Sequence, residues 1–277
     1  MKIFIFGSNG MLGSYITSVL SKKFNVKKFT RNDYDISNLS IDKLKLLLLD
    51  SGKESGLKKN DIVINCAGVI PQASKQIGLN TRLYFTINSL FPVVLGEICN
   101  KNRAKMIHIT TDCVFSGIDG NYDENAIHDE KNEYGVSKSL GEICNATIIR
   151  TSIIGEELRN KRSLLELFKL NKNKEINGYK NHLWNGVTCL QLAKIIDSMI
   201  TKMLFWKGVR HIFSPLPVSK FELVGIINNI YNLNIKINEY ETDKDVNKTL
   251  TTIFDTNSTF QLPDIKEQII EMKKYTL

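Results

Sequence analysis

A glycine-rich turn close to the start of the chain constrains its fold most. The short apolar run Lys2–Phe6 is typical of a buried strand, and the segment GSNGMLG at residues 7–13 follows it directly. This G-x-x-G-x-x-G spacing between a strand and a helix is the context of a dinucleotide-binding turn. Glycines permit a tight turn and a close approach to a pyrophosphate, which then faces the helix N-terminus. Glycines also serve plain turns, so the motif needs support from the rest of the chain.

That support comes from the alternation of strand-like and helix-like segments over the first 150 residues. Apolar runs predict strands at Lys2–Phe6, Val26–Phe29, Asp61–Asn65, Ala104–Thr110 and Ala146–Arg150. Helical patterns lie between them, at Met11–Lys23, Leu39–Leu49, Tyr84–Lys101 and Tyr134–Asn145. Strands separated by helices form right-handed β-α-β units and a parallel sheet. We therefore expect an α/β fold with a Rossmann-type doubly wound parallel sheet.

The second half of the chain shows a looser pattern. It predicts a strand at Val209–Phe213 and helices at Ser163–Leu170, Thr188–Met203, Ser219–Tyr231 and Ile265–Lys274. We expect a small C-terminal lobe that closes over the carboxyl edge of the sheet. The predicted division is an NADP(H)-binding domain at 1–155 and a smaller substrate-binding part at 156–277, interleaved with the first.

Composition excludes several other classes of protein. The net charge of +8 is spread along 277 residues without an aromatic-basic or recognition-helix pattern, so no nucleic-acid partner is expected. The five cysteines are scattered without a C-x-x-C motif and the four histidines are isolated, which predicts no metal site and reduced thiols in a cytoplasmic protein. The apolar runs are too short for a signal-peptide core or a membrane span. The oligomeric state, including a homodimer, stays open.

The end of the second predicted strand bears on the choice of cofactor. NAD enzymes usually carry an acid there, which holds the hydroxyls of the adenosine ribose. This chain has Arg31, whose guanidinium can pair with the 2′-phosphate of NADP. We favour NADP(H) over a merely solvated arginine, while Asp33 and Asp35 keep NAD(H) open.

Three side chains form a candidate catalytic group. Thr111 follows the fourth predicted strand, and Tyr134 and Lys138 stand four residues apart, on one face of a helix. A lysine beside a tyrosine favours the phenolate and lowers the pKa of the phenol, which then exchanges protons near neutral pH. Thr111 is expected to hold the reacting oxygen. A surface helix pair would show the same spacing, but the order of glycine turn, threonine and Y-x-x-x-K supports catalysis.

Together these segments resemble the dTDP-4-dehydrorhamnose reductase family. The resemblance covers most of residues 1–200 and rests on residues 7–13, 65–68, 88, 110–117, 134, 138, 141–142 and 149–152. It implies an extended short-chain dehydrogenase fold, a nicotinamide cofactor and a nucleotide-linked 4-keto-6-deoxy sugar as substrate. It also implies Thr111, Tyr134 and Lys138 as the catalytic triad.

The resemblance and the motifs together give the full set of candidate site residues. The candidate cofactor-binding residues are Gly7, Asn9, Gly10, Met11, Leu12, Gly13, Arg31, Asp35, Ile36, Cys66, Ala67, Gly68, Asn88, Thr110, Tyr134 and Lys138. The candidate substrate-binding residues are Thr111, Trp184 and Asn185, of which the last two stand where the family has a sugar-facing loop. An ordinary turn with a packed Trp184 is the alternative for that loop.

Two departures from related sugar enzymes matter. Asp112 and Cys113 follow Thr111 where sugar 4,6-dehydratases carry Asp-Glu, so a dehydratase is disfavoured. Cys113 stands where GDP-fucose synthases, which resemble this family, have an epimerising cysteine, but their partner histidine has no match in 155–165. We favour a space-filling cysteine. The alternatives are a bifunctional 3,5-epimerase/4-reductase that uses Cys113 and a regulatory member of the family without turnover.

Overall fold

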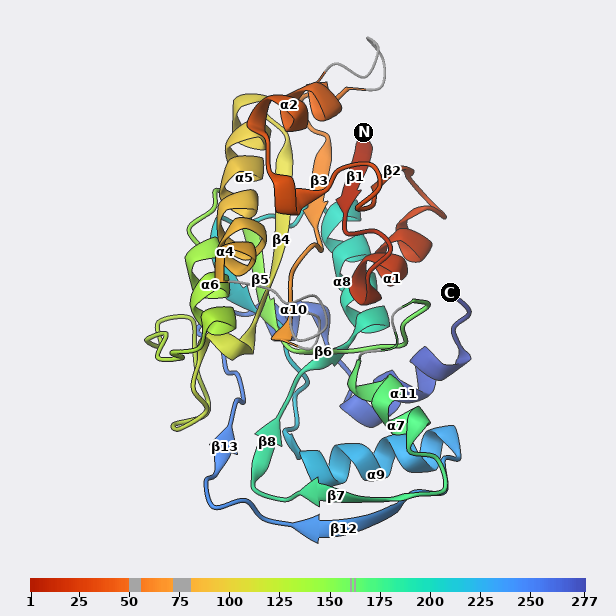
Figure 1. The fold of residues 1–277 in the computed structure, drawn as a ribbon. Helices are drawn as coiled ribbons and strands as arrows, with labels where there is room; N and C mark the ends of the chain where they lie inside the picture. The colour runs from red at the N-terminus through yellow and green to blue at the C-terminus, as the bar shows by residue number, and fades with distance from the viewer. Residues whose placement is uncertain (50–55, 72–80, 160, 162) are drawn as a thin grey trace.

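A parallel sheet of six strands runs through the centre of the molecule in the order β10-β5-β4-β3-β1-β2 (Figure 1). The computed structural model describes residues 1–49, 56–71, 81–159, 161 and 163–277. The strands are β1 (Lys2–Phe6), β2 (Asn25–Phe29), β3 (Ile62–Asn65), β4 (Lys105–Thr111), β5 (Thr147–Thr151) and β10 (Gly208–His211). Every neighbouring pair is parallel. The expected doubly wound α/β sheet is thus confirmed.

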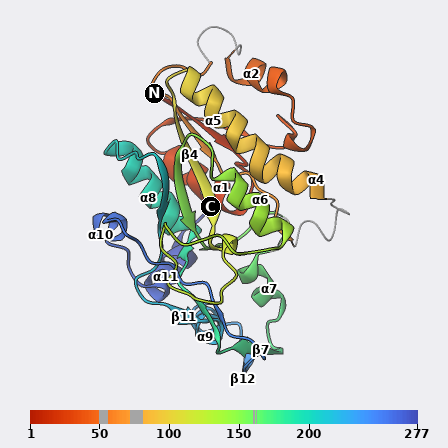
Figure 2. The ribbon, with the colours of Figure 1, turned by 90° about the vertical axis from the view of Figure 1, so that its left-hand side faces the viewer.

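Helices cover both faces of this sheet, as Figure 2 shows from the side. One face carries α2 (Ile41–Leu49), the continuous helical stretch of α4 (Thr81–Tyr84), η2 (Phe85–Leu90) and α5 (Phe91–Lys101), and α6 (Glu133–Gly141). The other face carries α1 (Met11–Leu20) and α8 (Cys189–Thr201), which pack together. Alternate residues of β1 enter the two cores, with Ile3 and Ile5 on the side of α1 and Phe4 and Phe6 on the side of α5. This is the period of two that a strand buried on both faces requires.

The stretch Thr81–Lys101 is long and apolar enough to cross a membrane by length and composition alone. Half of its most apolar window is buried inside the fold. Phe91 and Leu95 on α5 belong to the core beneath the sheet. The stretch is therefore a partly buried core helix, and its apolar character is explained by packing.

The C-terminal part is built from short strands and helices beyond the carboxyl ends of the main strands (Figure 1). A sheet of three strands has the order β11 (Val218–Ser219), β8 (His182–Trp184), β13 (Val246–Asn247). Two further pairs join β7 (Glu175–Tyr179) to β12 (Lys236–Tyr240) and β6 (Ile153–Ile154) to β9 (Val187–Thr188).

The other named elements lie in both halves of the chain. They are η1 (Ile36–Asn38), η3 (Asp112–Val114), α7 (Leu164–Leu170), α9 (Lys220–Tyr231), α10 (Thr256–Phe260) and α11 (Ile265–Lys274).

The C-terminal half also contributes to the central layers. β10 extends the main sheet beside β5, and α8 lies against α1. The structure thus joins residues from both sides of position 155 in one sheet. The domain boundary expected at residue 155 stays a prediction.

Candidate functional site

The glycine turn between β1 and α1 is shaped by close backbone contacts. Gly7 has a φ of +73°, a conformation that side chains rarely adopt, and its N–H donates to the carbonyl of Phe29 at 3.0 Å. A Cβ on Gly13 would lie 2.1 Å from the carbonyl oxygen of Gly7, so only glycine fits. Gly10 precedes α1 and provides no side-chain cap, which leaves the first amides of the helix available to a ligand. Asn9 and Gly10 are exposed, Met11 is partly buried and Leu12 is buried.

After the end of β2, the arginine and the two aspartates differ in their hydrogen-bond partners. Asp33 accepts hydrogen bonds from the backbone and hydroxyl of Thr30 at 2.8 and 2.7 Å, and these bonds lower its pKa. Asp35 caps η1, which begins at Ile36, and accepts from the amide of Ser37 at 3.0 Å. Arg31 is exposed and makes no hydrogen bond or ion pair within the described part of the chain. Both carboxylates thus have local partners, whereas the guanidinium is available.

Beyond β3, the predicted segment of Cys66, Ala67 and Gly68 is positioned by Asn65. The buried side chain of Asn65 accepts from the amide of Ala67 at 3.1 Å and contacts Nδ1 of His108 at 3.1 Å. A Cβ on Gly68 would lie 2.8 Å from Nζ of Lys138. The loop after β3 and the lysine of α6 therefore meet at the carboxyl edge of the sheet.

Asn88 ties this loop to the catalytic helix. Its buried amide accepts from the N–H of Val69 at 2.9 Å and donates to the carbonyl of Val69 at 3.0 Å. The same amide nitrogen donates to the hydroxyl of Ser137 at 3.0 Å. Asn88 lies in η2, a wide π-type turn of the kind often found at functional sites. Lys138, the residue after Ser137, is thereby fixed beside Gly68.

The end of β4 brings Thr111 to the same edge. Its hydroxyl donates to Asp112 Oδ1 at 3.0 Å and accepts from the amide of Cys113 at 3.2 Å, which starts the short turn η3. Thr110, the residue before it, is buried, and its hydroxyl has no partner among the described residues. The Thr111 side chain thus combines a capping role with a position at the end of the strand.

Tyr134 lies on α6 one turn before Lys138. Its ring packs edge-on against Tyr84 with the centroids 6.3 Å apart. Burial, and next the neighbouring Cys113, raise the pKa of the phenol, while a hydrogen bond with Thr111 opposes the rise. The expectation of a lowered pKa is therefore wrong for this structure, because the loss of hydration outweighs the nearby lysine. A phenol with a raised pKa is protonated at neutral pH and carries the proton that a reduction consumes.

Lys138 is almost completely buried at the base of the site. Burial lowers its pKa to about 8, while Glu142, which caps the C-terminal end of α6, favours the charged form. Glu142 in turn accepts from Nε and Nη2 of Arg150 at 3.0 and 2.5 Å. Arg150 also contacts His211 and His128, at 2.8 and 2.6 Å. This buried network holds the end of α6 against β5 and β10.

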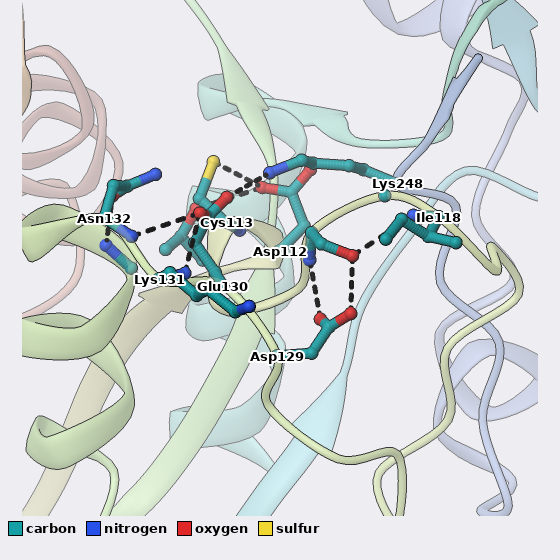
Figure 3. Close-up of polar contacts among 12 residues, drawn as sticks. Asp112, Cys113, Ile118, Asp129, Glu130, Lys131, Asn132 and Lys248 are labelled. Carbon is teal, nitrogen blue, oxygen red and sulfur yellow. Dashed lines mark hydrogen bonds and ion pairs between the residues drawn. The ribbon is translucent and has the colours of Figure 1, made fainter. Parts of the chain in front are cut away.

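The start of α6 is held by residues that the sequence did not indicate. Glu130 accepts from the amides of Lys131 and Asn132 at 2.9 and 3.2 Å, and its second oxygen lies 3.4 Å from Nζ of Lys248 (Figure 3). A Cβ on Gly135 would lie 2.5 Å from the carbonyl oxygen of Cys113. The helix that carries Tyr134 is therefore packed directly against the end of β4. No short motif could have revealed the partner Lys248, which is more than 100 residues away in the sequence.

Cys113 is partly exposed, and its thiol lies 3.5 Å from Asp112 Oδ1 (Figure 3). Burial, and next the carboxylate of Asp112, raise the pKa of the thiol to about 12, whereas Lys248 and Thr111 oppose the rise. The thiol is consequently neutral near pH 7. That state does not suit a base that removes a proton from a sugar carbon.

Trp184 ends β8, the central strand of the three-stranded C-terminal sheet, and Asn185 follows it. Both are buried. Asn185 donates to the carbonyl of Leu250 at 2.8 Å and accepts from the amide of Leu250 at 2.9 Å, so its side chain joins two distant segments. Nζ of Lys220 lies 4.9 Å from the centroid of a Trp184 ring. A substrate contact for the two predicted residues stays a prediction, and Asn185 has a clear structural role as well.

The described residues contain no group of three or more His, Cys, Asp or Glu side chains that could hold a metal ion. Among these residues the site is made of hydroxyl groups, amides, glycines and lysines. Such groups bind and orient organic anions and polar ligands.

Comparison with known proteins places these features in a family. The family model described as "RmlD substrate binding domain" matches residues 1–249. The dTDP-4-dehydrorhamnose reductase of Mycobacterium tuberculosis is 26% identical over 117 residues, which cover 42% of this chain and 34% of that protein. A probable low-salt glycan biosynthesis reductase of Haloferax volcanii is 28% identical over 168 residues, or 56% of this chain and 54% of that protein. The chain thus spans about a third to a half of the length of these curated relatives.

Solved structures agree over nearly the whole chain. The dTDP-4-dehydrorhamnose reductase of Bacillus anthracis, in complex with NADP, has a TM-score of 0.81 at 24% identity and covers 99% of both chains. The corresponding protein of Clostridium acetobutylicum has a TM-score of 0.77 at 22% identity, with the same coverage. These likenesses concern the fold, and the match over residues 1–249 concerns the sequence. The chain belongs to the RmlD substrate binding domain family.

Proposed function

We propose that this chain is a reductase that uses NADPH to reduce a nucleotide-linked 4-keto-6-deoxy sugar. The observation that carries the proposal is the meeting of the glycine turn, Thr111, Tyr134 and Lys138 at one edge of the sheet. The family match supports the same class of reaction, as do the names of two relatives, a dTDP-4-dehydrorhamnose reductase and a probable low-salt glycan biosynthesis reductase.

The residues of the turn fit a dinucleotide. Gly7 and Gly13 allow the backbone to fold tightly, and the uncapped start of α1 at Met11 presents amides to a pyrophosphate. Arg31, exposed at the end of β2, would pair with a 2′-phosphate, which is why NADPH is favoured over NADH. The related reductase of Bacillus anthracis was solved with NADP. When bound, the cofactor supplies the hydride.

Tyr134 would supply the proton. As the keto carbon receives the hydride, the carbonyl oxygen becomes an alkoxide, and the phenol of Tyr134 gives its proton to that oxygen. The products are a hydroxyl group and a phenolate that regains its proton from solvent. The raised pKa of Tyr134 keeps the phenol protonated before the reaction.

Lys138 and Thr111 would orient the reactants. Lys138, next to Gly68 and Asn88, is placed to hold the ribose of the cofactor and to stabilise the phenolate left behind. Thr111 would donate to the developing oxyanion, where a preorganised hydrogen bond contributes most. Trp184 would border the sugar. A cytoplasmic location and a homodimer remain expectations of the same proposal.

The proposal is tested with purified protein, NADPH and a panel of nucleotide-linked 4-keto-6-deoxy sugars. We expect loss of NADPH absorbance that depends on the keto-sugar, and a product two mass units heavier by mass spectrometry. Absence of turnover with every keto-sugar, although NADPH and nucleotide bind, would instead favour a regulatory member of the family. Solvent deuterium at the carbons next to the ketone would favour the epimerase/reductase, which the neutral thiol of Cys113 disfavours.

A further inference from the structure

Two lysines flank Trp184 from the strands on either side of it. In the sheet β11-β8-β13, Val218 pairs with Trp184 and Asn247 pairs with Leu183. Lys220 follows β11 directly and Lys248 follows β13 directly. Charge interactions connect both side chains to the end of β4, because Asp112 and Cys113 there act to raise the pKa of Lys220, and Lys248 acts to lower the pKa of Cys113. The two ammonium groups therefore belong to the edge where the proposed reaction takes place.

The two lysines differ in their partners. Lys248 lies 3.4 Å from the carboxylate of Glu130, so its charge is already balanced. Lys220 has no carboxylate partner within the described part of the chain, where its ammonium makes neither a hydrogen bond nor an ion pair. Its contact is with the face of a Trp184 ring, at 4.9 Å from the centroid. One charge at this edge is thus left without an oxygen ligand.

The surroundings make this unpaired charge costly. Burial lowers the pKa of Lys220, and the nearby Asp112, followed by Cys113, only opposes that effect. The carboxylate of Asp112 already accepts from Thr111 and from the thiol of Cys113. A half-buried ammonium with three donors and no acceptor loses hydration without compensation. An anionic ligand would restore the missing hydrogen bonds.

Local structure holds Lys220 in this position. It is the first residue of α9, whose capping box joins Ser219 and Glu222 by reciprocal hydrogen bonds of 3.1 and 2.7 Å. Its backbone is therefore fixed between β11 and α9, and the helix N-terminus adds a favourable field for negative charge. The side chain needs little further ordering to bind a ligand.

We propose that Lys220, beside Trp184, binds an anionic oxygen of the substrate's nucleotide diphosphate. This inference rests on the proposed function for the identity of the substrate, and it assigns a binding role to a residue outside the glycine turn and the Thr-Tyr-Lys group.

The test measures binding by calorimetry for the full chain and for Lys220→Met, Lys220→Arg and the charge-matched control Lys266→Met. Lys266 is exposed on α11. The probes are TDP, UDP and GDP, each with its nucleoside. For a diphosphate ligand, Lys220→Met weakens binding of the best diphosphate about tenfold or more, the scale of a lost charged hydrogen bond. Lys220→Arg retains most of the affinity, and Lys266→Met, the nucleosides and NADPH show no change.

UDP-glucose and UDP-glucuronic acid show whether Lys220 binds a sugar carboxylate instead. If diphosphate binding is unaffected but a preference for the glucuronic acid disappears in Lys220→Met, Lys220 binds a carboxylate and the proposal is overturned. Equal binding of all probes to native protein and Lys220→Met would overturn the proposal. Should Lys220→Met fail to fold, Lys220→Gln and the decrease of diphosphate affinity with salt in the native protein provide the same comparison.

The outcome is separable from that of the proposed function. Diphosphate binding that depends on Lys220, without turnover of any keto-sugar, would retain the binding site and reject the reductase. If a keto-sugar is turned over, and the KM and the diphosphate affinity are the same in the native protein and in Lys220→Met, the reductase is retained and the binding site is rejected.

Discussion

The two halves of the molecule position their functional side chains in different ways. In the N-terminal half several positioning contacts are local, since Asp35 caps its own turn, Asn65 binds Ala67 and Thr111 binds Cys113. The bond from Asn88 to Ser137 spans a longer stretch but stays within this half. In the C-terminal half they join distant segments, as in Asn185 with Leu250 and Lys248 with Glu130. The proposed cofactor side is thus encoded in short motifs, whereas the proposed substrate side exists only after the chain has folded.

The largest effect is expected from Tyr134→Phe, which tests the chemistry of the locally encoded half. The variant keeps the ring against Tyr84 and removes the proton donor, so turnover should fall about a hundredfold or more. NADPH affinity, measured by fluorescence titration, should stay within about twofold of the native value, because the ring and all other candidate cofactor-binding residues are retained. Turnover close to that of the native enzyme would remove Tyr134 from the mechanism.

Asn185→Ala should affect stability, because it breaks a contact between distant segments. The substitution leaves the N–H and carbonyl of Leu250 without their buried partner, which costs about 2 kcal/mol or more. We expect a lower midpoint in urea unfolding and a raised KM, with NADPH affinity retained by the folded protein. A loss of NADPH affinity equal to the loss of keto-sugar binding would contradict the division between the halves.

Arg31→Ala should produce a smaller effect, a change in cofactor affinity that leaves the substrate side unaffected. NADPH should bind the native protein better than NADH, and the variant should narrow this preference several-fold, since an exposed charged contact contributes modestly. The measurement is the ratio of the two dissociation constants. A native enzyme that prefers NADH would contradict the role of Arg31 before any substitution is made.

Cys113→Ser is expected to have the smallest effect. The thiol is neutral because its pKa is raised to about 12, so replacing it with a hydroxyl should retain most of the reductase activity. Reduction in deuterated water should place no deuterium next to the ketone beyond the background exchange of the keto-sugar. Enzyme-dependent deuterium that disappears in Cys113→Ser would establish the bifunctional alternative.

Most of the main sheet could be predicted from the sequence. The strand Lys2–Phe6 and the helix Ile265–Lys274 were predicted with the bounds that the structure has. The predicted helix Tyr134–Asn145 ends earlier, at Gly141, where a Cβ would lie 2.1 Å from the carbonyl oxygen of Asn88. Periodicity identifies such elements, because each buries a regular apolar face.

The short strands of the C-terminal part were not predicted. β8 and β13 have three and two residues, too few for a pattern, and they pair only because the fold brings residues more than 60 positions apart together. The raised pKa of Tyr134 and the unpaired Lys220 were missed for the same reason. Burial and charge at a site depend on neighbours that a linear motif does not contain.

The return of β10 to the main sheet restricts how this protein can be recombined with its relatives. Truncation after residue 155 would remove the partner of β5 and also α8, which packs against α1. The remaining fragment would present Ile148 and Ile149 on an unprotected edge, a template for aggregation. Exchange of substrate preference therefore calls for three crossovers, with 156–188 and 212–277 replaced and 189–211 retained from the parent that supplies the sheet.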